Sequence, residues 1–333
     1  MPGKVYVSRL LPPVVMEALR SAREISDLKF NDQDRPAARR ELMEGARWCD
    51  VLVSQLVDRI DAEVFDSNPR LKLVANYAVG YDNIDVREAT KKKVPVSNTP
   101  GVLTETTADL AWTLIMAVAR RLVEADHFMR TGKYTSWAPM LLLGQDVNGK
   151  VLGVVGLGRI GYAVARRAMG FNMRVLYTDV ERKPYDSEVG ANYVDMETLL
   201  READFVTLHP FLDKGSRHLI DDRELKMMKR TAYLINTSRG PVVNEKALAK
   251  ALKEGTIAGA GLDVYEREPE MEPELGRLAN VVVLPHIASA TIETRTAMGM
   301  IVVRNTLAVL RGEKPPTCVN PAVFVSDESK AVD

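Results

Sequence analysis

A chain of 333 residues predicts about two domains, and 46% hydrophobic residues are enough for a core in each. The 45 basic and 45 acidic residues cancel without a sustained block of one sign, which argues against a nucleic-acid surface or a polybasic membrane anchor. The N-terminal MPGKVYVSRL has no apolar signal core, and no window approaches roughly 18 uninterrupted apolar residues, so we expect a cytoplasmic protein without a membrane span. Cys49 and Cys318 lie far apart outside any Cys/His cluster, so we expect neither a disulfide nor a metal site.

The first hundred residues alternate between short apolar runs and helix-like stretches. The runs are KVYVS (4–8), DVLVS (50–54), KLVANY (72–77) and VPVSNT (94–99). PPVVMEALRSA and RPAARRELMEGA are two of the helix-like stretches. This β-then-α order predicts a parallel sheet covered by helices.

A second sheet is predicted beyond one long helical pattern at residues 104–128. The predicted strands are VLGVV (151–155), RVLYTD (174–179), DFVTLH (204–209), AYLINT (232–237), AGAGLDV (258–264) and NVVVLP (280–285). Helical segments separate most of them, which indicates a doubly wound sheet over roughly residues 101–286. Only the last residues, VFVSDESKAVD, resemble a loose tail.

Gly156, Gly158 and Gly161 form a G-x-G-x-x-G motif between the strand VLGVV and the helix-like GYAVARRAM. The first glycine permits a tight turn, the second lets the backbone approach a pyrophosphate, and the third lets helix and strand pack closely. The amides and positive dipole of the helix N-terminus favour phosphate groups. The motif alone could be an ordinary glycine turn, but its strand-turn-helix context predicts a dinucleotide site.

Asp179 ends the next predicted strand, 18 residues after Gly161. A carboxylate there can bind the adenosine ribose hydroxyls and repels a 2′-phosphate. Arg182 and Lys183 follow closely and could attract such a phosphate. We expect Asp179 to dominate, so that NAD(H) is preferred and NADP(H) is less favoured.

Arg239, Glu268 and His286 each follow a predicted strand late in the chain. The carboxyl ends of parallel strands share one edge of a sheet, where such folds bind ligands. Hydride transfer to a keto acid needs a cation, a proton donor and a group that tunes the donor, and a carboxylate beside an imidazole favours the protonated ring. Taken singly, Arg239 could be a capping residue, Glu268 a solvated acid and His286 a core residue.

The other three histidines are weaker candidates. His127 and His218 lack a preceding strand. His209 does follow a strand, but beside the expected cofactor trough. His286 is therefore the best candidate for the general acid and base.

The chain resembles the D-isomer-specific 2-hydroxyacid dehydrogenases, most closely the glyoxylate and hydroxypyruvate reductases. The resemblance extends from about residue 4 to residue 321 and rests on VVGLGRIG, LINTSRGPVVNEKALAKALKEG, AGAGLDVYEREP and NVVVLPHIASAT. It implies that Arg239, Glu268 and His286 are catalytic. It also implies an α/β fold in which a Rossmann-type doubly wound parallel sheet (101–286) binds NAD and is inserted into a smaller flavodoxin-like substrate domain (1–100 and 287–333), with the active site in the cleft between them.

The resemblance implies further contacts. Those for the cofactor are Thr104, Gly156, Gly158, Arg159, Ile160, Gly161, Asp179, His209, Pro210, Ser216, Thr237, Ser238, Asp263 and Ala288. Those for the substrate are Leu56, the backbone around Ala78, Val79 and Gly80, Arg239, His286 and Trp137. Trp137 resembles a residue that reaches into the other subunit's site, which implies a homodimer, although core packing would also explain it. In HPFLDKGSRHLI, Phe211 and Ser216 depart from the usual family pattern, which leaves the nicotinamide or ribose contacts open.

The predicted function is reversible, NADH-dependent reduction of a small 2-keto acid, glyoxylate or hydroxypyruvate, to the D-2-hydroxy acid. The alternative is a corepressor-like protein that senses NAD(H) without turnover, but such proteins carry interaction segments outside the core. Formate dehydrogenases pair the histidine with glutamine, and 3-phosphoglycerate dehydrogenases usually need basic residues for a phosphate. Glu268 argues against the first, and the absence of a further regulatory domain after Asn320 argues against the second.

Overall fold

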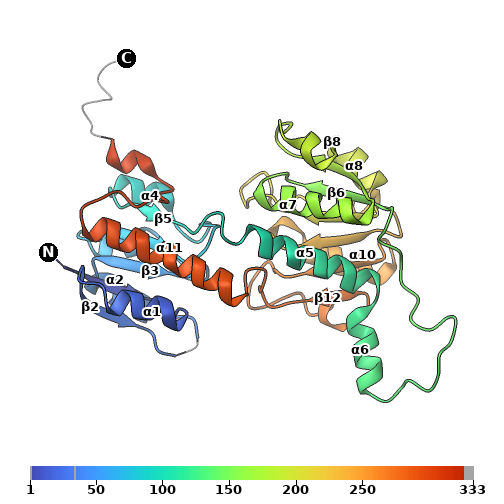
Figure 1. The fold of residues 1–333 in the computed structure, drawn as a ribbon, viewed down its shortest axis with the longest axis horizontal. Helices are drawn as coiled ribbons and strands as arrows, with labels where there is room; N and C mark the ends of the chain where they lie inside the picture. The colour runs from blue at the N-terminus through green and yellow to red at the C-terminus, as the bar shows by residue number, and fades with distance from the viewer. Residues whose placement is uncertain (1, 34, 326–333) are drawn as a thin grey trace. The chain divides into compact units, whose positions relative to one another are not determined.

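The chain forms two compact α/β units, here described from a computed structural model of residues 2–33 and 35–325. The smaller unit takes Met1–Leu103 and Thr291–Asp333, and the larger unit takes Thr104–Ala290 (Figure 1). Both sheets are entirely parallel, so the predicted fold class is confirmed. Most of the predicted tail, residues 326–333, lies outside the described residues, while Pro321–Phe324 form the 3₁₀ turn η5.

The smaller unit is built on a five-stranded sheet of order β2-β1-β3-β4-β5, the order of flavodoxin-like folds. Its elements are β1 (Gly3–Val7), α1 (Pro13–Arg20), β2 (Ile25–Phe30), α2 (Arg39–Trp48), β3 (Val51–Ser54), α3 (Ala62–Ser67), β4 (Leu73–Asn76), α4 (Val86–Lys91), β5 (Val96–Ser97) and α11 (Ile292–Leu310). Val51 and Val53 pack with α1 and α11 on one face, whereas Leu52 packs with α2 and α3 on the other. Burial of both faces explains the nearly continuous apolar strands.

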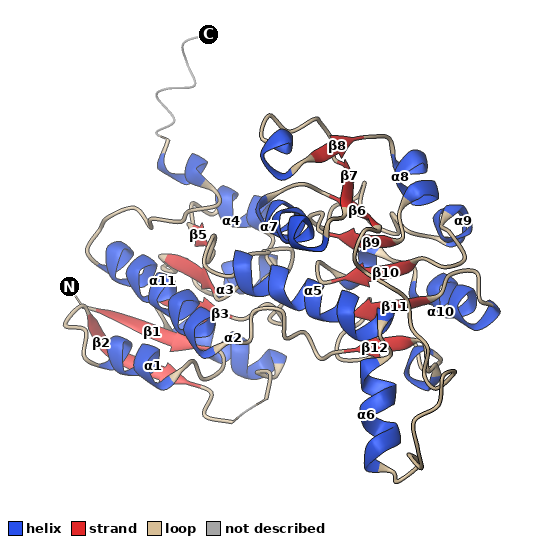
Figure 2. Cartoon of the chain, turned by 45° about the vertical axis from the view of Figure 1, so that its right-hand side comes forward, coloured by secondary structure: helices blue, strands red, loops and turns tan. Residues whose placement is uncertain are grey.

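The larger unit is built on a seven-stranded sheet of order β12-β11-β10-β9-β6-β7-β8 (Figure 2). Its elements are α5 (Thr104–Ala119), α6 (Leu122–Arg130), β6 (Val151–Val155), α7 (Arg159–Ala168), β7 (Arg174–Thr178), β8 (Ala191–Tyr193), α8 (Met196–Glu202), β9 (Phe205–Leu208), α9 (Asp222–Met227), β10 (Tyr233–Asn236), α10 (Glu245–Glu254), β11 (Gly259–Leu262) and β12 (Val281–Val283), with 3₁₀ turns η1 (Met169–Phe171), η2 (Asp186–Val189), η3 (Gly240–Val242) and η4 (Leu275–Arg277). Helices α5 and α7 cover one face, and α8, α9 and α10 cover the other. The strand order reverses beside β6, which is where doubly wound folds bind nucleotides.

One helix was predicted over residues 104–128, and this prediction is wrong because the helix breaks after Ala119. Arg121 has a left-handed backbone (φ 53°), and its guanidinium binds Glu124 at 2.8 and 2.9 Å. The amide of Gln145 donates to the carbonyl of Ala119 at 2.9 Å. The returning chain thus takes an acceptor that a continuous helix would use.

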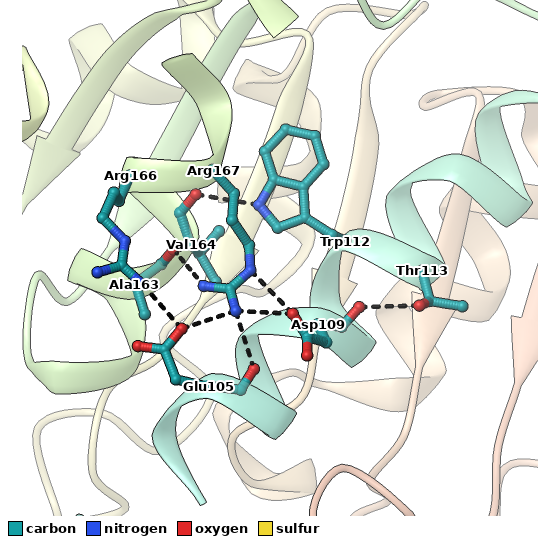
Figure 3. A network of polar contacts seen from close by, with 8 residues as sticks. All are labelled: Glu105, Asp109, Trp112, Thr113, Ala163, Val164, Arg166 and Arg167. Carbon is teal, nitrogen blue, oxygen red and sulfur yellow. Dashed lines mark hydrogen bonds and ion pairs between the residues drawn. The ribbon is translucent and has the colours of Figure 1, made fainter. Parts of the chain in front are cut away.

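The first two turns of α5 are tied to α7 by ion pairs (Figure 3). Arg167 Nη2 lies 2.7 Å from both Glu105 Oε2 and Asp109 Oδ1, and Arg166 Nη2 lies 2.9 Å from Glu105 Oε2. The hydrogen bond from Arg167 lowers the pKa of Glu105. Trp112 Nε1 donates to a backbone carbonyl of α7 at 3.0 Å. These contacts fix the start of α5 against the helix that begins at the glycine motif.

Two edge strands, β2 and β8, have no counterpart among the predicted strands. The side chains of β2 are mostly half-buried or exposed, and β8 has only three residues. These two strands lack the buried apolar pattern on which the prediction relies, whereas the edge strands β5 and β12 keep buried apolar residues. Over residues 2–33 and 35–325, none of the helices is long and apolar enough to cross a membrane.

Candidate active site

Three adjacent strands of the larger unit carry Arg239, Glu268 and His286 in the loops that follow them. Arg239 follows β10, Glu268 follows β11 and His286 follows β12, and these strands are neighbours in the sheet. Because the strands are parallel, all three loops leave the same edge. The structure therefore places the three candidate residues at one strand-end edge.

Glu268 and His286 form a direct pair. His286 Nδ1 lies 2.8 Å from Glu268 Oε2, and the two side chains are 23% and 25% exposed. Glu268 Oε1 also accepts the backbone N–H of Tyr265 at 3.1 Å. Within the described residues, His286 Nε2 has no hydrogen-bond partner, so it can exchange a proton with a ligand.

The backbone after His286 is held by Asp263. His286 has a left-handed backbone (φ 55°), and the amides of Ile287 and Ala288 donate to the two oxygens of Asp263 at 2.7 and 2.8 Å. Burial raises the pKa of the Asp263 carboxyl group. Asp263 and Ala288, both predicted as cofactor contacts, thus form one anchor for the histidine loop.

The loop that carries Arg239 is shaped by its own polar residues. Asn236 Oδ1 accepts the N–H and hydroxyl of Ser238 at 3.0 and 2.8 Å, and Asn236 Nδ2 donates to the Arg239 carbonyl at 2.9 Å. Arg239 Nη1 donates to the Ser238 carbonyl at 2.8 Å. A Cβ on Gly240 would lie 1.8 Å from the carbonyl carbon of Tyr265. Only glycine therefore lets this loop lie against the loop that carries Glu268.

Sequence reasoning missed Glu245, which supports the chain on both sides of Glu268. One Glu245 oxygen accepts the N–H of Glu266 in a short hydrogen bond, and the other accepts the N–H of Glu272 at 2.8 Å. Glu245 is buried and is the first residue of α10, so from the sequence it resembled an ordinary acid in a first helical turn. No sequence signal links it to residues more than twenty positions away.

A second histidine–glutamate pair shows that such a contact alone does not identify the proton donor. His218 Nε2 lies 2.8 Å from Glu266 Oε1. His218 follows no strand directly, whereas His286 is separated from β12 by two residues. Placement at the strand edge, and not the pair itself, distinguishes His286.

The glycine motif has the backbone that a dinucleotide requires. Gly156 has φ 89°, which favours glycine, and a Cβ on Gly161 would lie 2.0 Å from the Gly156 carbonyl oxygen. Space beside Gly158 is open, since nothing lies within 4 Å of where its Cβ would be. Gly158 is the N-cap of the ten-residue helix α7, whose first residues are Arg159 and Ile160. These features fit a pyrophosphate at the helix N-terminus.

Asp179 follows β7 beside this motif. Its oxygens accept the N–H of Leu157 at 2.9 Å and of Val180 at 2.7 Å. Lys183 Nζ lies 3.5 Å from Asp179 and 3.2 Å from Glu181. The nearby Arg182 pairs with Asp186 at 2.9 Å. Each cation of this segment is thus already paired with a carboxylate.

The remaining predicted cofactor residues of the larger unit differ in their surroundings. The buried hydroxyl of Thr237 has no hydrogen-bond partner among the described residues, which fits a polar ligand group. The Ser216 hydroxyl is instead committed to the Phe211 carbonyl at 2.6 Å. His209 Nε2 lies 2.9 Å from the Thr207 hydroxyl, and burial lowers the pKa of His209 to about 3, so its ring is neutral.

The last two predicted cofactor contacts are Thr104, at the start of α5, and Pro210, in the loop after β9. Thr104 is the first residue of α5 and is half-buried, and Pro210 is also half-buried. The Pro210 nitrogen lies 3.1 Å from where a Cβ on Gly156 would be. The loop after β9 is therefore close to the glycine motif.

The predicted substrate loop belongs to the smaller unit and follows β4. Ala78 is buried, and Leu56, Val79 and Gly80 are half-buried. Trp137 lies in the larger unit and is 78% exposed, so it is not a core residue of this chain. Over residues 2–33 and 35–325, no group of three or more His, Cys, Asp or Glu residues is placed to hold a metal ion.

Comparison with known proteins gives matches over nearly the whole chain. Residues 112–288 match the family described as "D-isomer specific 2-hydroxyacid dehydrogenase, NAD binding domain". The chain is 53% identical over 326 residues to a glyoxylate reductase of Korarchaeum cryptofilum, covering 97% of each chain. It is 52% identical over 328 residues to a glyoxylate reductase of Thermococcus kodakarensis, covering 97% of this chain and 98% of that one. A solved NADPH-dependent glyoxylate/hydroxypyruvate reductase of Sinorhizobium meliloti, in complex with NADP and malonate, is similar with a TM-score of 0.84 at 30% identity, covering 98% and 99% of the two chains.

Proposed function

Because the chain belongs to the D-isomer specific 2-hydroxyacid dehydrogenase family, we propose that it reduces glyoxylate, and other small 2-keto acids such as hydroxypyruvate, with NADH. Chiral products would be D-2-hydroxy acids. The chain is an NAD(P)-dependent oxidoreductase, and its relatives named glyoxylate reductase give no support to a sensor without turnover. The observation that carries the mechanism is the contact between His286 and Glu268 at the strand-end edge that also carries Arg239.

Gly156, Gly158 and Gly161 would hold the nicotinamide dinucleotide, which would supply a hydride to the keto acid when bound. Arg239 binds the substrate and stabilises the negative charge that develops on its oxygen. His286 is oriented through Nδ1 by Glu268 and gives a proton from Nε2 to the carbonyl oxygen. In the reverse direction the neutral ring accepts that proton. The backbone amides of Val79 and Gly80 bind the substrate carboxylate.

We assign the cofactor to the larger unit and the substrate carboxylate to the smaller unit. The glycine motif, the open space beside Gly158 and the unpartnered Thr237 hydroxyl support the first assignment. The backbone N–H groups of Val79 and Gly80, which donate no hydrogen bond within residues 2–33 and 35–325, support the second. Leu56 lies in the neighbouring loop of the smaller unit and would contact the C3 end of the substrate.

We propose that NAD(H) is preferred to NADP(H). A 2′-phosphate beside β7 would meet the carboxylate of Asp179, while Arg182 and Lys183 are paired with acids. We expect kcat/KM to be at least about tenfold higher with NADH than with NADPH, since like charges at close range cost more than 1.4 kcal/mol. Asp179→Asn should lower the ratio of kcat/KM with NADH to kcat/KM with NADPH. Asp204→Asn, at a position distant in the sequence, is the matched control and should leave this ratio unchanged. Equal kcat/KM values for the two cofactors in the wild-type protein would contradict this preference.

We propose that the protein is a homodimer in which a second copy of the chain covers the segment formed by α6 and the loop after it. This segment extends away from the sheet of the larger unit (Figure 1), and α6 has no buried residue. Trp137 and Met140 are 78% and 76% exposed, and Met129 and Leu143 are also exposed. A second copy would remove this apolar surface from water. Light scattering should give twice the chain mass, and Trp137→Glu should shift the protein to monomer; a monomeric wild-type protein would contradict the proposal.

The test of the proposed reaction is the loss of NADH absorbance with glyoxylate, hydroxypyruvate, pyruvate and phenylpyruvate. We expect turnover with the two small acids named first. NADH binding, followed by fluorescence, is measured on the same protein. If NADH binds but none of the four keto acids is reduced, the proposed function is wrong.

A further inference from the structure

The loop after β4 has two backbone N–H groups without partners. Val79 and Gly80 are half-buried, and neither N–H donates a hydrogen bond within residues 2–33 or 35–325. Neither N–H group is committed to an acceptor within these residues, so both can donate to an external acceptor. Two consecutive donors suit the two oxygens of a carboxylate.

Each of these N–H groups belongs to a peptide whose carbonyl group accepts a hydrogen bond from the segment after β5. The Ala78 carbonyl accepts the N–H of Thr99 at 2.9 Å, and the Val79 carbonyl accepts Asn98 Nδ2 at 2.8 Å. In a trans peptide the C=O of one residue and the N–H of the next point in opposite directions. Thr99 therefore fixes the direction of the Val79 N–H, and Asn98 fixes that of the Gly80 N–H. Both donors point away from the segment after β5.

Asn98 is itself held in place. Its carbonyl accepts the Thr317 hydroxyl at 2.6 Å, and its N–H donates to the Thr317 carbonyl at 3.3 Å. Asn305 of α11 donates to the Thr317 hydroxyl at 2.8 Å. On the far side of the loop, Asn76 Nδ2 donates to the Gly80 carbonyl at 2.9 Å. The backbone that carries the Asn98 side chain is thus held by Thr317, and the residue is half-buried.

We propose that Asn98 is a positioning residue that directs the Gly80 N–H, beside that of Val79, toward the carboxylate of the 2-keto acid substrate. This inference rests on the proposed function. Asparagine suits the role because its amide can donate to the Val79 carbonyl. Aspartate of nearly the same size cannot donate when ionised, and it would add a negative charge near an anion site.

The test compares Asn98→Ala and Asn98→Asp with the wild-type protein. Each variant is assayed for KM and kcat with glyoxylate, for the Kd of NADH and for thermal stability. We expect KM to rise about tenfold in Asn98→Ala and further in Asn98→Asp, since one oriented hydrogen bond and an added charge are affected. The kcat and the NADH Kd should stay within about threefold of wild type, because neither variant touches the side chains of the larger unit.

Asn31 provides a matched control in the same unit. Its side chain also donates to a backbone carbonyl, that of Arg35 at 3.3 Å, in a different loop. Asn31→Ala and Asn31→Asp should leave KM unchanged. If Asn98→Ala does not fold, Asn98→Asp keeps the size of the side chain and carries the comparison.

The outcomes separate the two proposals. A wild-type KM in both Asn98 variants, with glyoxylate turnover intact, would overturn the positioning role and leave the proposed function standing. A fall in kcat at unchanged KM would also overturn it. Absence of turnover in the wild-type protein would overturn the proposed function and this inference with it.

Discussion

The two units share a parallel α/β architecture but present different kinds of groups at their strand ends. The larger unit carries the side chains Arg239, Glu268 and His286 after three adjacent strands. The smaller unit carries the backbone N–H groups of Val79 and Gly80 after β4. A side-chain site depends on the residue at its own position. A backbone site depends on the residues that hydrogen-bond to the carbonyl group of each peptide and so orient its N–H group.

The largest effect is expected at His286. In His286→Asn the ring that donates the proton is lost, so kcat for glyoxylate reduction should fall by about 10²- to 10⁴-fold. Stopped-flow or steady-state NADH absorbance measures it. The exposed His127 is the matched control, and His127→Asn should retain activity. A His286→Asn enzyme with kcat near that of wild type would show that another group is the proton donor.

Arg239→Gln should have the next largest effect. Loss of the cation that stabilises developing charge should lower kcat/KM by about a hundredfold to a thousandfold. Arg201→Gln removes an exposed arginine of α8 that pairs with Glu197 and should change nothing. If Arg239→Gln and Arg201→Gln have the same kcat/KM, Arg239 does not stabilise the charge that develops on the substrate.

His209 also follows a strand of the larger unit, but its effect should be on stability. Its pKa in the folded chain is about 3, against 6.5 for the free side chain, so the unfolded chain binds the proton first as the pH falls. The stabilisation is complete above about pH 6.5 and decreases toward pH 3 by up to about 1.4 kcal/mol per pH unit. Urea unfolding of His209→Gln at several pH values should show a shallower acid slope than wild type. Identical slopes would contradict a His209 that stays neutral in the folded chain.

The smallest effect is expected from Val79→Ala. The N–H group remains when the side chain is shortened, so KM for glyoxylate should stay within about threefold of wild type. The same assay as for Asn98 measures it. A tenfold higher KM would mean that the substrate contacts the valine side chain, and the contrast between a side-chain site and a backbone site would not hold.

Much of the fold follows from local pattern. Alternate residues of β3 pack on opposite faces, and buried apolar runs of this kind made most strands predictable. The glycine motif was predictable for a similar reason, because each glycine meets a requirement of its own backbone position. The break after Ala119 was not, since the group that ends the helix comes from Gln145.

Local sequence pattern predicted most of the strands and helices, the glycine motif and the polar residues after strands, because each depends on residues that are close together in the chain. Only the tertiary structure decided which groups these residues contact. The pairing of His286 with Glu268 spans 18 positions, and the support of Val79 by Asn98 spans 19. The order of strands in the sheet determines which of these residues come close enough to form hydrogen bonds. The sequence alone contains many other donors and acceptors that could pair in a different strand order.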